Sequence, residues 1–172
     1  AKAKTRIVYG GVIGRRENLL MVESLGVPAR PLQKNDLDWG INALVDTQPP
    51  FKNNRFPARR RAGLIIDHHP RSPQTQSDLI VIDKDVGATT TVLGEALIAT
   101  GLDVSRRLAT AIAYGISSET QNLGREAGPR DFAVYMQFLP KANLRALWRI
   151  ANPPRPASFF QTRSRGIRDA FI

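Results

Sequence analysis

Two short apolar runs that each end in an aspartate constrain the fold of this chain more than any other feature. Residues 44–46 are Leu-Val-Asp, and residues 64–67 are Leu-Ile-Ile-Asp. An uninterrupted apolar run of this kind is typical of a strand buried on both faces of a parallel sheet. Ligand sites in open α/β sheets lie at the carboxyl ends of such strands. The pattern therefore predicts two carboxylates that face one another across a cleft at one sheet edge.

The rest of the chain indicates strands in its first half and helices in its second. Strands are expected at residues 6–9, 42–45, 63–66 and 78–82, the last of them near a sheet edge because its apolar residues alternate. Residues 51–61 contain proline, asparagine and arginine without periodicity and are expected to form a loop. Helices are expected at residues 16–25, 89–100, 105–118, 129–138, 143–150 and 158–170. This order predicts one α/β domain over residues 1–172, with a mostly parallel sheet flanked by helices and a helical C-terminal part.

Composition excludes some kinds of site and partner. The chain has no cysteine, which excludes disulfides, thiolate metal ligands and cysteine nucleophiles. No apolar run approaches the roughly 20 residues needed to span a bilayer, so we expect no membrane partner and a cytoplasmic location. The formal net charge of +10 favours anionic partners such as nucleotides or nucleic acid. The arginines are scattered, however, and an ordinary solvated surface explains them equally well.

The only two histidines of the chain stand together directly after the second strand-end aspartate, as Asp67, His68 and His69. With Asp46 they form a set of carboxylate and imidazole donors that suits manganese, magnesium, iron or zinc. The alternative is a histidine pair packed at a turn. Glu119 is a further candidate ligand, although on the residues alone a solvated acid at a helix end is the better explanation. Residues 87–89, Gly-Ala-Thr, suit either phosphate binding at a helix start or ordinary helix capping.

Four separated motifs resemble those of the DHH phosphoesterases and together cover nearly the whole chain. They are the strand-end Asp46, the Asp-His-His of residues 67–69, the Gly-Ala-Thr of residues 87–89, and the Tyr-Gly-Ile-x-x-Glu-Thr of residues 114–120. Residues 11–18 and 46–49 also resemble a stand-alone DHH subgroup. The resemblance implies a hydrolase with two divalent metals, usually Mn²⁺ with Mg²⁺ as an alternative. It further implies action on phosphodiester bonds of nucleotides or short oligonucleotides.

The resemblance also implies a role for each matching residue. Asp46 would bridge the metals, His68 and Glu119 would be metal ligands, Asp67 would orient the site, and His69 would contact solvent or phosphate there.

Four residues outside these motifs are expected to bind substrate, since an arginine can grip a phosphate with two parallel hydrogen bonds. They are Arg15, Arg16, Asn18 and Arg125. Pairing of these arginines with surface acids is an equally good explanation.

Two departures from the family pattern bear on activity. The family's first motif, a histidine followed by Asp-x-Asp on the first strand, is absent, and its place is expected upstream of residue 6. The DHH-associated C-terminal domain is also absent, and Glu119 stands where the family has aspartate. We therefore expect a piece of a longer protein that holds manganese weakly and has little activity alone.

Two other functions remain open, together with the oligomeric state. One is a non-catalytic regulatory module, derived from a DHH domain, that binds nucleotide or nucleic acid. The other is a basic nucleic-acid-binding α/β domain in which the Asp-His-His run is accidental. A homodimer is also left open.

Overall fold

Five short strands form two parallel sheets in the computed structural model, which describes residues 3–49 and 51–170. Strand β1 (Ile7–Tyr9) pairs with β2 (Ala29–Pro31). The second sheet has the order β3 (Ala43–Val45), β4 (Ala62–Asp67) and β5 (Ser77–Ile82), so β5 lies at an edge as predicted. Residues 51–61 form a loop, as predicted. The α/β class and the parallel pairing are confirmed.

The register of β3 and β4 brings the two strand-end aspartates to the same edge. Val45 is paired with Ile66, and the backbone N–H of Asp46 donates to the Ile66 carbonyl at 2.9 Å. The prediction that both carboxylates leave the sheet on one edge is therefore confirmed. The three strands that end at Tyr9, Asp46 and Asp67 are expected to lie parallel and adjacent. This is wrong for the first of them, because β1 pairs with β2 in a separate sheet. Strand β2 was not predicted, because its sequence, Ala-Arg-Pro, has neither an apolar run nor alternation.

The described residues also form six α-helices and two short 3₁₀ helices. Five of the α-helices are α1 (Arg16–Ser24), α2 (Thr89–Thr100), α3 (Arg106–Glu119), α4 (Pro129–Phe138) and α5 (Leu144–Ala151). The sixth is α6 (Ala157–Arg168), and the 3₁₀ helices are η1 (Asp36–Asp38) and η2 (Leu139–Lys141). Serine before an apolar helical stretch is typical of an N-cap, and the side chain of Ser105 accepts from the N–H of Leu108 at 3.3 Å. All six predicted helices are confirmed to within two residues at each end.

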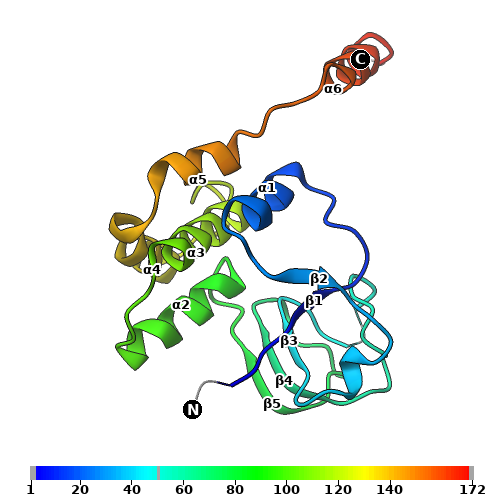
Figure 1. Cartoon of the computed structure of the whole chain (residues 1–172), viewed down its shortest axis with the longest axis vertical. Helices are drawn as coiled ribbons and strands as arrows, with labels where there is room; N and C mark the ends of the chain where they lie inside the picture. Colours follow the sequence, from blue (N-terminus) through cyan, green and yellow to red (C-terminus); the bar gives the residue numbers. More distant parts are fainter. Residues whose placement is uncertain (1–2, 50, 171–172) are drawn as a thin grey trace.

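The helices pack mainly on one another beside the sheets (Figure 1). The largest apolar core lies among α2, α3 and α4, and includes Ile112, Ile116, Val134 and Phe138. Helix α6 stands apart from this body at the end of an extended segment (Figure 1), and each of its residues is exposed or half-buried. Among the described helices, none is both long enough and apolar enough to cross a membrane.

The two faces of the three-stranded sheet are covered unequally. On one face, Ile65 is fully buried against Phe56 and neighbouring apolar side chains. On the other face, Val45, Leu79 and Val81 are 48%, 58% and 38% exposed. On the same face Leu64 and Ile66 of β4 are half-buried, so the expectation that β4 is buried on both faces is confirmed for one face only.

Candidate metal centre

Three side chains converge where β3 and β4 end. Asp46, His68 and His69 each place a ligand atom within 4.8 Å of the other two. Nε2 of His68 lies 3.6 Å from Oδ1 of Asp46, and Nδ1 of His69 lies 3.9 Å from the same oxygen. Asp46 adopts a left-handed backbone conformation with φ 62°, which aspartate tolerates better than most residues. This turn carries the chain out of β3 directly at the site.

The ring of His68 is suited to a cation. Its Nδ1 lies 3.3 Å from the Val86 carbonyl, which can only accept, so Nδ1 carries the proton of the neutral ring. The lone pair is then on Nε2, which is buried and has no hydrogen-bond partner among the described residues. A buried acceptor without a donor is unfavourable, and here it faces a carboxylate oxygen that also only accepts. A divalent cation between these atoms would satisfy both, so the donor set fits a metal.

Asp67 organises the turn that carries the histidines. It is fully buried, and its Oδ1 accepts from the backbone N–H groups of His68 at 2.8 Å and His69 at 3.2 Å. The same oxygen lies 2.8 Å from Nδ1 of His69, and Oδ2 accepts from Nε2 of Gln48 at 2.9 Å. Burial raises the pKa of Asp67, but the hydrogen bonds from His69 and Gln48 outweigh it and hold the pKa below its usual value. The orienting role of Asp67 towards a metal stays a prediction.

Gln48 is a supporting residue that sequence reasoning did not single out. Its side chain is fully buried, and Oε1 accepts from the backbone N–H of Ser72 at 2.9 Å and from the Thr75 hydroxyl at 2.6 Å. The amide therefore links the carboxylate of Asp67 to the loop before β5. The only signal in the sequence was the Asp-Thr-Gln-Pro run of residues 46–49, which resembled a DHH subgroup without indicating this role.

Thr89 holds Asp46 from the start of α2. Its hydroxyl donates to Oδ1 of Asp46 at 2.7 Å, and the residue is 3% exposed. The surrounding segment is held by Asp131, the third residue of α4, which is fully buried. Asp131 accepts from the N–H of Gly87 at 2.9 Å and from the hydroxyl of Thr91. The Gly-Ala-Thr segment therefore positions a predicted metal ligand, a role that neither the phosphate-binding nor the capping interpretation included.

The structure places Glu119 beside this group but outside it. It is the last residue of α3 and is not among the ligand atoms that lie within 4.8 Å of one another. Its charge nevertheless acts on His69. Burial lowers the pKa of His69, but the bond to Asp67 and the charges of Asp67, Asp46 and Glu119 outweigh it and raise the pKa. Ligation by Glu119 stays a prediction, while His69, which was expected only nearby, lies within the group.

The predicted substrate-binding residues lie at two other places. Arg125 is exposed and forms an ion pair with Glu126 at 3.0 Å, as its alternative interpretation proposed. Arg15 is the N-cap of α1 and lines a hollow of about 470 Å³ between α1 and the carboxyl end of α3. Asn18, also on α1, accepts from the Tyr114 hydroxyl at 2.7 Å, and Arg16 is exposed. Substrate binding by these residues stays a prediction.

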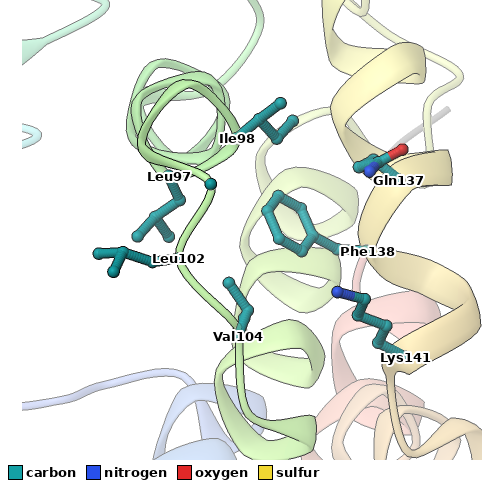
Figure 2. Close-up of a pocket in the computed structure, with 8 residues that line it drawn as sticks. Leu97, Ile98, Leu102, Val104, Gln137, Phe138 and Lys141 are labelled. Atoms are coloured by element: carbon teal, nitrogen blue, oxygen red, sulfur yellow. The ribbon is translucent and has the colours of Figure 1, made fainter.

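A second hollow, of about 190 Å³, lies between α2 and α4 (Figure 2). Most of the residues that line it are apolar, and Gln137 and Lys141 also line it, as Figure 2 shows. None of the predicted site residues contributes to its lining, which consists of Leu97, Ile98, Gly101, Leu102, Val104, Gln137, Phe138 and Lys141. It is therefore separate from the histidine cluster.

Comparison with known proteins finds two relatives by sequence. An uncharacterized protein of Methanocaldococcus jannaschii is 35% identical over 151 residues, which are 86% of this chain and 30% of that protein. The A-adding tRNA nucleotidyltransferase of Aquifex aeolicus is 36% identical over 107 residues, which are 60% of this chain and 12% of that enzyme. This chain thus spans less than a third of either relative. No protein family model matches it.

Two solved structures share the fold at low sequence identity. A Bacteroides fragilis exopolyphosphatase-related protein has a TM-score of 0.62 and 12% identity, over 96% of this chain and 61% of that one. A Methanococcus jannaschii protein assigned as a family II inorganic pyrophosphatase has a TM-score of 0.53 and 18% identity, over 73% and 43% of the two chains. The chain therefore has an α/β fold of the kind found in these two proteins.

Proposed function

We propose that this protein is a divalent-metal-dependent phosphoesterase of the DHH type, which hydrolyses phosphodiester bonds of nucleotides or short oligonucleotides. The observation that carries the proposal is the buried Nε2 of His68, which lacks a hydrogen-bond partner among the described residues and faces the carboxylate of Asp46. The names of the two structural neighbours, which refer to a pyrophosphatase and an exopolyphosphatase, support chemistry at phosphorus. The nucleotide substrate rests on the sequence resemblance and on the net charge of +10.

Each residue of the cluster has a distinct part in the proposal. Asp46 and His68 would hold the cation, and Thr89 would fix the Asp46 carboxylate through its hydroxyl. When bound, a divalent cation such as Mn²⁺ neutralises phosphate charge and lowers the pKa of a coordinated water. Asp67 would hold Nδ1 of His69, so that Nε2 of that ring faces the phosphate of the substrate.

One observation favours a second candidate, a module that binds nucleotide without turnover. Among the described residues, the ligand atoms that converge come from one carboxylate and two histidines, with Glu119 outside the group. The loop that follows β1, residues 10–15, contains no acidic residue. A centre for two metals would need further anionic ligands, because paired cations are held by several carboxylates or bridging anions.

The experiment combines Mn²⁺ titration calorimetry with a hydrolysis panel. The panel contains short oligoribonucleotides, cyclic dinucleotides, phosphorylated adenosine nucleotides, pyrophosphate and polyphosphate. We expect Mn²⁺ binding that is lost in Asp46→Asn and His68→Ala but kept in Asp103→Asn, a control whose side chain is 97% exposed. Turnover of a nucleotide phosphodiester supports the phosphoesterase. Binding of nucleotide with no turnover of any substrate supports the second candidate, and unchanged Mn²⁺ affinity in both site variants refutes the metal centre.

A further inference from the structure

We propose that the hollow between α1 and the carboxyl end of α3 binds the nucleoside part, sugar and base, of a nucleotide. The inference rests on the proposed function, because it names the substrate class that the same site would take. The hollow measures about 470 Å³, within the range of roughly 300–1,000 Å³ that small-molecule sites occupy. Its polar lining consists of Arg15, Glu17, Ser117, Ser118, Gln121 and Asn122, together with Tyr114.

The chemistry of this lining suits an uncharged polar ligand. Two hydroxyls and two carboxamides both donate and accept hydrogen bonds, as the hydroxyls of a sugar and the ring edges of a base require. Arg15 is the one cation of the lining, and the carboxylate of Glu17 is paired with Arg155 at 2.9 Å. A chain of phosphates carries several negative charges and would need several cations. The lining therefore favours a nucleoside over inorganic pyrophosphate or polyphosphate.

The backbone at the rim of the hollow is strained. Gln121, Asn122 and Leu123 have φ of 48°, 60° and 64°, which is the left-handed region. Asparagine visits this region readily, but glutamine and leucine do so at a cost in stability. Leu123 packs against the helical core, whereas the side chains of Gln121 and Asn122 line the hollow. Glycine would form the same turn without strain, so the turn itself does not require the two amides that line the hollow.

The hollow adjoins the candidate metal centre through the packing of α3 on the start of α2. Tyr114 in its lining directly precedes Gly115, where an added Cβ would lie 2.6 Å from the hydroxyl of Thr90. The neighbouring Thr89 holds Asp46 through its own hydroxyl. A nucleotide whose phosphate lies at the metal centre therefore has a polar recess next to it for its nucleoside.

A pair of glycine substitutions separates binding from folding. Gln121→Gly combined with Asn122→Gly removes both amides, and glycine adopts the left-handed backbone at no steric cost. Glu126→Gly is the matched control, because Glu126 also has a left-handed backbone, with φ 59°, but is not in the lining. Calorimetry of adenosine, guanosine, cytidine and uridine, without metal, gives the Kd of each protein, and thermal melting gives its Tm.

We expect at least one nucleoside to bind, with a Kd that rises about tenfold or more in the double variant, which corresponds to about 1.4 kcal/mol. The control should keep the Kd of the unaltered chain, and the Tm of the double variant should be no lower. Absence of nucleoside binding, an unchanged Kd in the double variant, or weakened binding of pyrophosphate alone would overturn the inference. Mn²⁺ titration of the same samples reports the proposed function separately. Nucleoside binding without Mn²⁺ binding refutes only the metal centre, and Mn²⁺ binding without nucleoside binding refutes only the nucleoside site.

Discussion

Removing the carboxylate of Asp131 should destabilise the fold and loosen the metal centre at the same time. Asp131 is fully buried, and its oxygens accept from the N–H of Gly87, the N–H of Gly128 and the hydroxyl of Thr91. These bonds fix the segment that presents Thr89 to the candidate ligand Asp46. Asp131→Ala therefore tests whether one carboxylate on α4 controls the geometry of a site formed by other elements.

The size of the effect follows from which groups lose a partner. A hydrogen bond to a charged group contributes about 1.5–3 kcal/mol, and a buried N–H left unpaired costs about 1–3 kcal/mol. Gly87 N–H is buried, whereas Gly128 N–H is partly buried and can reach water. We therefore expect Asp131→Ala to cost about 3–5 kcal/mol. Asp131→Asn keeps one oxygen for the two N–H groups and turns its NH₂ to the Thr91 hydroxyl, so it should cost only about 1–2 kcal/mol.

Urea unfolding of the three proteins measures these free energies, and thermal melting checks them. At about 2–4 °C per kcal/mol for a chain of this size, Asp131→Ala should lower the Tm by about 6–20 °C. Asp103→Ala is the control, because its side chain is 97% exposed and should change stability by less than about 0.5 kcal/mol. The affinity for Mn²⁺ should fall in Asp131→Ala. A stability within about 1 kcal/mol of the unaltered chain would refute the view that Asp131 holds this segment.

Three further predictions concern single contacts. Thr89→Val removes the hydroxyl that orients the carboxylate of Asp46 at the metal centre. The affinity for Mn²⁺, measured by calorimetry, should therefore fall about 10–100-fold while the Tm changes little. An unchanged affinity would exclude this role. Gly87→Ala would place a Cβ 2.5 Å from a backbone carbonyl and should cost about 1–3 kcal/mol in urea unfolding, whereas Gly14→Ala, with nothing within 4 Å, should cost much less. The hydrogen bond from Arg30 lowers the pKa of Asp36 from 3.8 to about 2, so its stabilisation is complete above pH 3.8 and is lost as the pH falls towards 2. The Tm difference between the unaltered chain and Asp36→Asn should therefore shrink over that range, and a difference independent of pH would contradict the ion pair.

Local patterns were sufficient to predict most elements of this fold. The apolar runs before Asp46 and Asp67 predicted two parallel strands with carboxylates at one edge, and apolar spacing predicted all six helices. These features depend on the period of side chains along one element, which can be recognised in sequence without knowing what the element packs against. Strand β2 was not predicted, because its own sequence has no strand pattern and its conformation depends on hydrogen bonds to β1.

The partners of the site residues were decided by the tertiary structure alone. The chain order shows that Asp67 precedes two histidines, but not that Gln48 donates to it or that Thr89 holds Asp46. Those bonds join residues 19 and 43 positions apart, and they exist only because strand register and helix starts bring the groups together. The same holds for His69, which lies inside the ligand group while Glu119 lies outside it. Residue type determines which chemistry is available, and the packing of distant elements determines which atoms are near enough to perform it.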